Sequence, residues 1–397
     1  MLTPAEADAA IAAAVVPVSE EQAPLAACAG RVLRAPLLAE RDAPPFDRVA
    51  MDGIAFARGV EGRRRFRVAG TQAAGSAPLV LASTADCIEV MTGAVMPRGC
   101  DTVVPVEQVA MAAGHADLDA GCDPEPWRHV HRQGSDARSG DVLLEAGTRL
   151  SAPELAIAAS AGQAELTVSR APRIAILTTG DELVEPGRPI LPHQVRRSNA
   201  YGLSAALSLA GFAPTSNLQL PDRQDAIESA LGAALLHHDV LVLSGGVSAG
   251  RFDYVPGALA ALGVRVAFHG IAQRPGRPMW FGSGPAGTAV FALPGNPVSV
   301  LVCLARYVVP ALRGMVCARP EEPPSVALAR EYRFEKPLTC FLPVKLGYDR
   351  HGRTLAEPRP TGGSGDFISL AGTDGFVELP RGPATHAAGL AVPFFRW

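Results

Sequence analysis

Apolar runs alternate with helical periodicity through the middle of the chain, residues 171–318. Continuous stretches of Val, Leu, Ile and Ala are typical of strands that are covered on both faces of a sheet. Their regular alternation with helices predicts a doubly wound, mostly parallel α/β sheet, whose ligands bind outside the carboxyl ends of the strands. The expected strands are RIAILTT, APTSNLQL, DVLVLSG, RVAFHGI and TAVFALPG, and the expected helices are 198–210, 222–236, 255–262 and 297–312.

The regions on either side of this α/β zone contain short predicted strands and many turns. Residues 44–136 contain short strands separated by turns roughly every ten positions, which indicates a β-rich unit. Residues 323–397 return to short strands punctuated by Pro and Gly, which predicts a small C-terminal β barrel. Thr3 and Pro4 suit the start of an alanine-rich helix, and Ser151 suits the cap of a second one.

These patterns divide the chain into four units. A helical linker domain comprises residues 1–43 and 137–170, and a β-rich domain, residues 44–136, is inserted into it. The α/β domain follows at residues 171–322, and the β-barrel domain occupies residues 323–397. We expect the two alanine-rich helices of the linker domain to pack on each other across the insertion.

Composition narrows the class of protein. The formal net charge of the 397 residues is −3 and no dense Lys/Arg run is present, which argues against nucleic acid or a membrane as the partner. The seven cysteines include no CxxC pair, so reduced thiols are expected. The N-terminal residues lack the features of a secretory signal, and the apolar stretch 298–312 is interrupted by Arg306 and Pro310 and is too short to span a membrane. We therefore expect a soluble, cytoplasmic protein.

The segment with the most chemical information is DVLVLSGGVSAGRFD, residues 239–253. A buried strand ends there at Ser244, and Gly245 and Gly246 allow another molecule to approach the backbone closely. A helix begins just after Asp253, so the loop can bind an anion through free N–H groups and the helix dipole. A carboxylate beside an anion site needs a cation between them. This combination predicts a phosphorylated ligand held with a divalent metal ion.

Two further loops fall at the same edge of the predicted sheet, and a third loop adds positive charge. Thr178–Glu182 follows the first strand, and residues 294–299, PGNPVS, follow the last. Because parallel strands end at one edge, these loops should lie beside Ser244. The loop QRPGRP adds two arginines on a backbone stiffened by proline. Their forks suit a tetrahedral oxyanion, although a solvated surface turn has the same composition.

The β-rich region contributes two more acidic residues. Asp52 lies in a proline-stiffened stretch, although Asp52-Gly53 is also a common hairpin turn. Asp136 follows in RQGSD, where spacing alone assigns no role.

Read together, these loops resemble the molybdopterin molybdenumtransferase family of the MoeA type, which includes the E domain of gephyrin. The matching segments follow the family's order across residues 44–301: PPFDRVAMDGIA, MTGAVMPRGCDTVV, GSDARSGDVLLEAG, LTTGDELVEPG, RSNAYGL, SGGVSAGRFDYV, RPGRP and LPGNPVSV. The family's fold has the same four units. Its members are typically elongated homodimers whose active cleft is shared between subunits, which implies a dimerisation role for the helical linker domain.

The resemblance implies the last step of molybdenum cofactor synthesis. Molybdenum is inserted into adenylylated molybdopterin, the phosphoanhydride is cleaved, and AMP is released. Mg²⁺ is the implied cofactor and molybdate is a substrate. A second copy of the chain, molybdopterin adenylyltransferase and the apo-molybdoenzymes are the implied protein partners.

The resemblance also implies roles for individual residues. Four carboxylates are catalytic, Asp52, Asp136, Glu182 and Asp253, and all of them except Asp136 are metal ligands. The implied substrate-binding residues are Thr179, Gly180, Asp181, Ser244, Gly245, Gly246, Ser248, Arg274, Arg277, Pro294, Gly295, Asn296, Pro297, Ser299 and Ser364.

The chain departs from the family pattern in three places. Arg274 and Arg277 stand where the family often has Lys, so positive charge is kept. The family's R-x-x-F-x-R motif is LTCFLP here, residues 338–343, with Lys345 as the nearest cation. Ser364 matches only part of the family's Q-G-S turn.

Two other functions compete with this hypothesis. The adenylyltransferase that makes the substrate has a related α/β fold but is usually a lone α/β domain, so the additional β regions count against it. A non-catalytic molybdopterin-binding scaffold is the second alternative. The presence of all four carboxylates argues against it.

Overall fold

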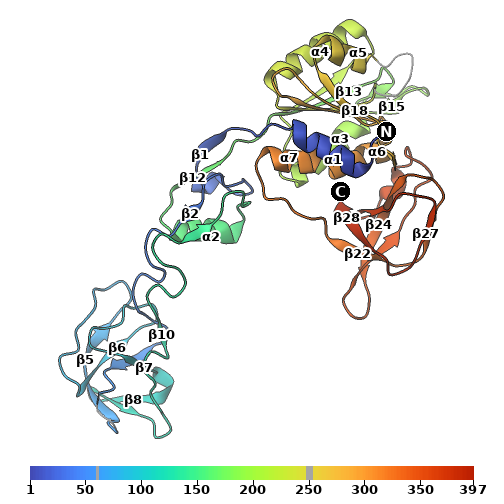
Figure 1. Cartoon of the computed structure of the whole chain (residues 1–397). Helices are drawn as coiled ribbons and strands as arrows, with labels where there is room; N and C mark the ends of the chain where they lie inside the picture. Colours follow the sequence, from blue (N-terminus) through green and yellow to red (C-terminus); the bar gives the residue numbers. More distant parts are fainter. Residues whose placement is uncertain (60–61, 247–253) are drawn as a thin grey trace.

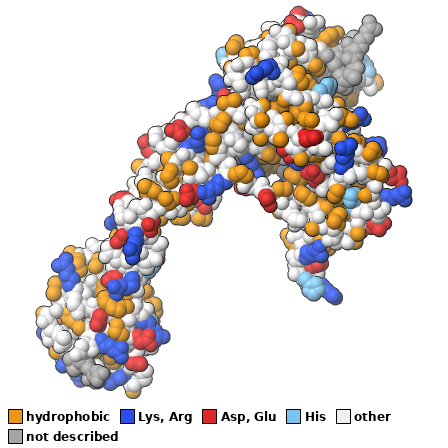
Figure 2. Space-filling view, viewed as in Figure 1, with side chains coloured by type: hydrophobic (Ala, Val, Ile, Leu, Met, Phe, Trp, Pro, Cys, Tyr) orange, Lys and Arg blue, Asp and Glu red, His pale blue; other side chains and the backbone are white. Residues whose placement is uncertain are grey.

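The computed structural model describes residues 1–59, 62–246 and 254–397. The molecule is elongated: a β-rich body lies at one end and is joined by a narrow segment to a larger body that contains both termini (Figure 1). Acidic and basic side chains are interspersed over the face shown in Figure 2, in keeping with the net charge of −3.

The larger body is built on a mixed sheet in the order β16-β13-β17-β21-β20-β18. The first four of these strands are parallel. β20 runs antiparallel to them, and β18, which is antiparallel to β20, runs in the same direction as the first four. The prediction of a doubly wound, mostly parallel sheet is confirmed. The strands are β13 (Ile174–Thr179), β16 (Ser216–Leu220), β17 (Val240–Ser244), β18 (Arg265–His269), β20 (Trp280–Ser283) and β21 (Ala289–Leu293).

Alternate side chains of these strands enter two different cores. Ile176 and Val242 belong to a cluster with α3 (Ser198–Leu209), whereas Leu177 and Leu243 belong to a cluster with α4 (Gln224–His237) and α5 (Val255–Ala261). This alternation follows from the two-residue period of a strand. Helices therefore cover both faces of the sheet, and polar groups are left to the strand ends.

The first helix, α1 (Pro4–Ala14), begins with the expected cap at Thr3, whose side chain and backbone both bond Glu6. Its Ala7 and Ile11 are buried in the α/β core. The second alanine-rich helix, α2 (Ala152–Ser160), contributes instead to a separate cluster of the narrow segment. The expectation that these two helices pack on each other is wrong, because the apolar face of α1 is covered by the sheet.

The narrow segment consists of the outgoing and returning chain, hydrogen bonded to each other as three short antiparallel ribbons. They lead to a six-stranded sheet in the order β7-β4-β6-β5-β9-β8. The ribbons are β1 (Glu20–Pro24) with β12 (Glu165–Ser169), β2 (Leu37–Leu38) with β11 (Val142–Leu144), and β3 (Arg48–Val49) with β10 (Val130–His131). The sheet strands are β4 (Gly53–Phe56), β5 (Arg65–Gln72), β6 (Asp86–Val90), β7 (Thr102–Pro105), β8 (Val109–Ala112) and β9 (His115–Leu118).

The C-terminal region forms the expected barrel. β24 (Thr339–Tyr348) pairs with strands on both of its sides, which closes a five-stranded barrel. Its other strands are β22 (Ser325–Leu328), β25 (Thr354–Pro358), β26 (Gly375–Leu379) and β28 (Ala391–Arg396), and a separate hairpin pairs β23 (Tyr332–Phe334) with β27 (Ala384–His386). β19 (Gln273–Arg274), from the α/β region, adds to the edge of β24.

One long helical run connects the α/β sheet to the barrel. It comprises α6 (Pro297–Cys303), a π turn at Leu304–Val308 and α7 (Val309–Met315), so it is longer than the predicted 297–312. Pro310 has no N–H for the carbonyl of Arg306, and a π turn absorbs the break in register. At 19 residues this run is long and apolar enough to cross a membrane, which corrects our expectation that it is too short. Here, however, Val302 and Leu312 are fully buried in the protein core.

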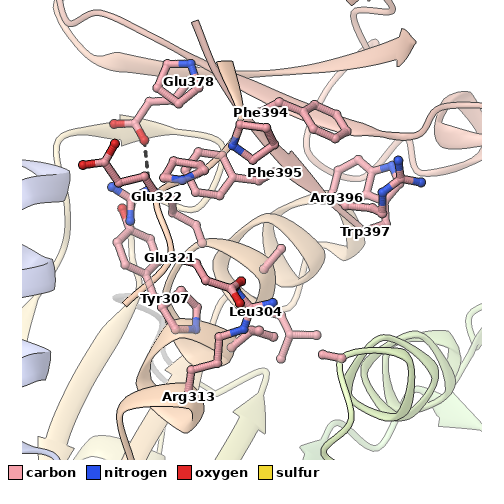
Figure 3. A pocket seen from close by; sticks show the side chains of 18 of the residues that line it. Leu304, Tyr307, Arg313, Glu321, Glu322, Glu378, Phe394, Phe395, Arg396 and Trp397 are labelled. Carbon is pink, nitrogen blue, oxygen red and sulfur yellow. Dashed lines mark hydrogen bonds and ion pairs between the residues drawn. The ribbon is translucent and has the colours of Figure 1, made fainter. Parts of the chain in front are cut away.

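Arg306 joins three parts of the larger body. Its guanidinium forms two bonds of 2.9 Å to Asp8 of α1 and one of 2.8 Å to Glu378 of the barrel, and its side chain is only 12% exposed. These groups line a cleft of about 1590 Å³ between the long helix and the barrel (Figure 3). Phe395 contributes a ring 5.1 Å from the guanidinium carbon. The Arg306 side chain is therefore largely removed from water, as is Glu378 at 21% exposure, whereas Asp8 is 43% exposed.

Arg306→Met should lower the free energy of unfolding by about 3 kcal/mol, because it leaves two carboxylates without their shared partner in a partly dry site. Urea unfolding monitored by tryptophan fluorescence measures the change. Arg223→Met is the matched control, since its pair with Asp225 is about two-thirds exposed and should contribute little. Equal losses for the two variants would contradict the role assigned to Arg306.

Candidate functional site

Three loops leave the sheet side by side. In the strand register Thr178 lies opposite Ser244, and Ser244 lies opposite Leu293. The loops that begin at Gly180, Gly245 and Pro294 therefore start at the same level of one edge. This is the edge at which a doubly wound sheet binds its ligands.

The backbone packs closely against neighbouring residues where glycine occurs. A Cβ on Gly245 would lie 2.8 Å from the carbonyl oxygen of Thr179, and one on Gly246 would lie 2.7 Å from Val255 Cγ2. Both glycines have positive φ, +96° and +69°. A side chain at either position would therefore be strained and would collide with its neighbours.

Asn199, near the start of α3, bonds two of these loops. Its amide nitrogen donates to Ser244 Oγ at 2.9 Å and to the carbonyl oxygen of Gly295 at 2.7 Å. Sequence reasoning noted its segment, RSNAYGL, but assigned the residue no role. The available signal was a polar side chain at a helix start that faces the same sheet edge.

Asp222 is a second residue that the sequence did not single out. It accepts hydrogen bonds from the Thr179 hydroxyl and, at 3.3 Å, from the backbone N–H of Asp181. Its own N–H donates to the Asp181 carboxylate at 3.1 Å. Thr179 and Asp181 thus support the first loop, in addition to any contact with a ligand.

Arg197 is the third such residue, and it is only 6% exposed. Its guanidinium donates to Thr178 Oγ1 at 2.8 Å, to Glu185 at 2.6 Å, and to the side-chain oxygen of Asn217. The hydrogen bond from Arg197 holds the pKa of Glu185 below its ordinary value. With the small ribbon β14 (Leu183–Val184) and β15 (Val195–Arg196), these bonds tie residues 180–197 to the sheet.

Glu182 lies exposed on that tethered loop. Its carboxylate oxygens are 2.7 Å from the position that a Cβ on Gly180 would occupy, and Gly180 has a φ of +145°. The carboxylate therefore folds back over Gly180, at the sheet edge, in the space that the missing side chain leaves open.

The arginine loop lies at the same edge. β18 ends at His269 and β20 begins at Trp280, which pairs with Ala292 near the end of β21. The connection between β18 and β20 carries Arg274 and Arg277, and both side chains are exposed. Positive charge is thus available beside the glycine loops.

The barrel reaches this edge through Ser364. Its hydroxyl accepts a hydrogen bond of 2.9 Å from Asn296, and its carbonyl accepts one of 3.1 Å from the N–H of Val298. Ser299, in contrast, is only 3% exposed and lies beneath the start of α6. Pro294 is also buried, whereas Gly295 is exposed and Pro297 opens the helix.

Asp52 and Asp136 lie elsewhere, on the β-rich body and its junction with the narrow segment (Figure 1). Asp52 accepts bonds of 2.6 and 2.7 Å from the N–H and hydroxyl of Thr92, and the backbone bond in particular lowers its pKa. Asp136 is 2.7 Å from His131 Nε2, which likewise lowers the pKa of its carboxyl. One chain does not bring these carboxylates to Glu182. Ser248 and Asp253 lie outside the described residues.

The donor set at the sheet edge suits a hard cation only in combination with other ligands. Within residues 1–59, 62–246 and 254–397, no group of three or more His, Cys, Asp or Glu side chains is arranged to hold a metal ion. Glu182 offers carboxylate oxygens, and Mg²⁺ is usually bound by one or two carboxylates together with substrate phosphates. The chemistry of the donors therefore fits Mg²⁺ bound jointly with a phosphorylated ligand.

Comparison with known proteins defines the class. Residues 2–162 match the MoeA N-terminal region (domains I and II), residues 175–314 match a probable molybdopterin binding domain, and residues 325–397 match the MoeA C-terminal region (domain IV). The chain thus has the domains of a MoeA-type protein, including a probable molybdopterin binding domain.

Relatives that match nearly the whole chain support the same class. The chain is 43% identical to a molybdopterin molybdenumtransferase of Synechocystis sp., over 93% of each chain, and 34% identical to molybdopterin molybdenumtransferase 2 of Mycobacterium tuberculosis, over 92% of each. It also resembles the crystal structure of the molybdopterin biosynthesis protein moeA from Pyrococcus horikoshii OT3, with a TM-score of 0.83, 26% identity and full coverage of both chains. The chain belongs to the molybdopterin molybdenumtransferase family, and the protein is a transferase.

Arg197→Met should free residues 180–197 from the sheet and leave Thr178 Oγ1 and Asn217 with unsatisfied bonds. We expect backbone amide exchange in this segment to accelerate by at least tenfold, in line with the roughly 1–3 kcal/mol cost of unsatisfied buried groups. Hydrogen–deuterium exchange with peptide resolution measures it. Arg188→Met, an exposed change on the same loop, is the control, and an equal effect there would contradict the role assigned to Arg197.

Proposed function

We propose that the protein inserts molybdenum into adenylylated molybdopterin with release of AMP, the last step of molybdenum cofactor biosynthesis. The observation that carries this proposal is the meeting of three glycine-containing loops and an arginine loop at one sheet edge, in a chain of this family. An edge of this kind accepts anionic groups on backbone N–H donors. Adenylylated molybdopterin, molybdate and AMP are all anions.

The residues divide naturally between the two substrates. Gly180, Gly245, Gly246 and Gly295 keep the backbone accessible, so the phosphates of adenylylated molybdopterin can approach the strand ends. Arg274 and Arg277 supply the positive charge that a tetrahedral molybdate dianion requires. Asn199 and Asp222 hold the loops in register. The remaining members of the proposed substrate-binding set are Thr179, Asp181, Ser244, Ser248, Pro294, Asn296, Pro297, Ser299 and Ser364.

We assign Mg²⁺ to the carboxylates Glu182 and Asp253, together with Asp52. When bound, such an ion neutralises charge on the phosphoanhydride during its cleavage. Glu182 is suited to this role because its carboxylate lies over Gly180, beside the loops proposed to accept the phosphates. Asp136 is the fourth proposed catalytic carboxylate.

A homodimer with a shared cleft explains the position of the two remaining carboxylates. Asp52 and Asp136 lie on a body that extends away from the sheet edge of its own chain (Figure 1). In a twofold dimer that body can approach the sheet edge of the other chain, so each cleft would combine Glu182 of one subunit with Asp52 of the partner subunit. This arrangement, with residues 1–43 and 137–170 as the dimerisation domain, is part of the proposal.

The proposed setting is the cytoplasm. Molybdopterin adenylyltransferase, which supplies the substrate, and apo-molybdoenzymes, which receive the product, are the proposed protein partners. An adenylyltransferase activity of this chain itself is less favoured, because the MoeA-type regions outside the α/β domain have no place in that hypothesis.

Incubation of the protein with adenylylated molybdopterin and magnesium should release AMP only when molybdate is added. Asp253→Asn should abolish that release without changing the melting temperature. Liquid chromatography of the nucleotides measures it. A parallel reaction with molybdopterin, ATP and magnesium should leave ATP unconsumed. Consumption of ATP there would instead support the adenylyltransferase, and AMP release by Asp253→Asn at the rate of the unmodified protein would remove Asp253 from the mechanism.

Complementation tests the shared cleft. Asp52→Asn and Glu182→Gln should each be inactive alone, whereas a mixture unfolded and refolded together should recover about a quarter of the activity, because half of the dimers are mixed and each contains one intact cleft. Co-refolding two batches of Asp52→Asn is the control. Failure of the mixture to regain activity, with dimers present by light scattering, would overturn the arrangement.

A further inference from the structure

A buried polar network lies beneath the arginine loop. Tyr307, on the π turn of the long helix, donates its hydroxyl to Gln273 Oε1. Gln273 in turn donates to the carbonyl oxygen of Pro275 at 3.1 Å and approaches Cys303 Sγ at 3.7 Å. Cys303 lies 3.8 Å from the carbonyl oxygen of Gly276. Tyr307 is 1% exposed, and Gln273 and Cys303 are fully buried.

The protonation states give this network one orientation. Burial raises the pKa of the Tyr307 phenol and raises the pKa of the Cys303 thiol to about 12, so both stay protonated and act as donors. A phenol that donates to the amide oxygen of Gln273 directs the amide NH₂ toward the loop. Two successive loop carbonyls are therefore held by buried side chains: that of Pro275 by Gln273 of β19, and that of Gly276 by Cys303 of α6.

The fit above the network is tight. Gly276 has a φ of +88°, and a Cβ there would lie 2.5 Å from Cys303 Sγ and 2.7 Å from Gln273 Nε2. On its other side the loop is joined to the barrel, since Gln273 and Arg274 pair with Thr339 and Cys340 of β24. The backbone between Arg274 and Arg277 is thus held from below and from one edge, while both guanidinium groups remain exposed.

The π turn explains why Tyr307 reaches the loop. A π turn contains one more residue per hydrogen-bonded ring than the α-helix, so it changes the direction in which the following side chains point. Arg306, in the same turn, bonds Asp8 and Glu378. Two adjacent residues of one turn therefore contact the barrel and the arginine loop.

We propose that Tyr307, acting through Gln273 and Cys303, is a positioning residue that sets the two arginines of the loop for molybdate. It does not touch the anion. The inference rests on the proposed function, because it takes molybdate as the ligand of Arg274 and Arg277. An unsupported loop would sample other conformations, and the affinity for the anion would fall by the fraction of time that the two arginines spend apart.

Tyr307→Phe tests this role with the loss of a single hydroxyl. We expect the molybdate concentration that gives half-maximal AMP release to rise by about tenfold, with kcat at saturating molybdate unchanged. The net free energy of one buried hydrogen bond corresponds to about this change in an equilibrium constant. Calorimetric titration of the full chain with sodium molybdate alone should show the same loss without turnover. An unchanged molybdate requirement would overturn the proposal.

Thr288→Val is the matched control. Thr288 is 4% exposed and donates its hydroxyl to backbone carbonyls, 3.3 Å from that of Leu235, at the opposite end of β21. It should lower the melting temperature as Tyr307→Phe does, but leave the molybdate requirement unaltered. If it raised the requirement equally, general destabilisation would be the cause and the proposal would fail.

The arginines themselves separate this inference from the proposed function. Arg277→Ala should raise the molybdate requirement, and if it does not, the assignment of molybdate to this loop is wrong. If it does, adding Tyr307→Phe to the double variant Arg274→Ala/Arg277→Ala should raise the molybdate requirement little further. The tyrosine and arginine substitutions then affect the same contact with the anion. Full additivity would show that Tyr307 acts elsewhere. Should Tyr307→Phe not fold, Cys303→Ala, which removes only the thiol, is expected to shift the requirement in the same direction and decides the question.

Discussion

Parallel pairing of β13, β17 and β21 sets the position of the candidate groups in the α/β body. The side chains of these strands are almost completely buried, on both faces, under two separate layers of helices. Polar groups are excluded from such a sheet except at the strand ends, where Thr179 and Ser244 lie. Because the three strands end at the same level, their loops have to share a small space, and glycine is what allows them to do so.

Much of this arrangement could be predicted from the sequence. Uninterrupted apolar runs identified the central strands, and turn residues after them identified Gly180, Gly245 and Gly295 as members of one edge. Arg197, Asn199 and Asp222 were missed for a common reason. Each acts through hydrogen bonds to segments 12 to 96 residues away, and no local pattern records such partners.

The long helix and α1 show a different limit. The sequence predicted that this helix ends at residue 312, whereas tertiary packing continues the helical run to Met315 and accommodates Pro310 with a π turn. The first helix was assigned to the linker because of its alanine content, yet its apolar face packs against the α/β core. Composition indicates that a helix forms, but the surface that it covers depends on contacts distant in sequence.

Three paired ribbons connect the β-rich body to the larger body. Its outgoing and returning strands are hydrogen bonded to each other at Glu20–Pro24, Leu37–Leu38 and Arg48–Val49. The attachment is therefore a twisted two-stranded ribbon, which bends perpendicular to its hydrogen-bonded plane more readily than within that plane. The paired strands also define where the inserted body could be removed. A short turn joining residue 38 to residue 142 would follow the existing register of β2 and β11 and leave the rest of the chain paired as it is.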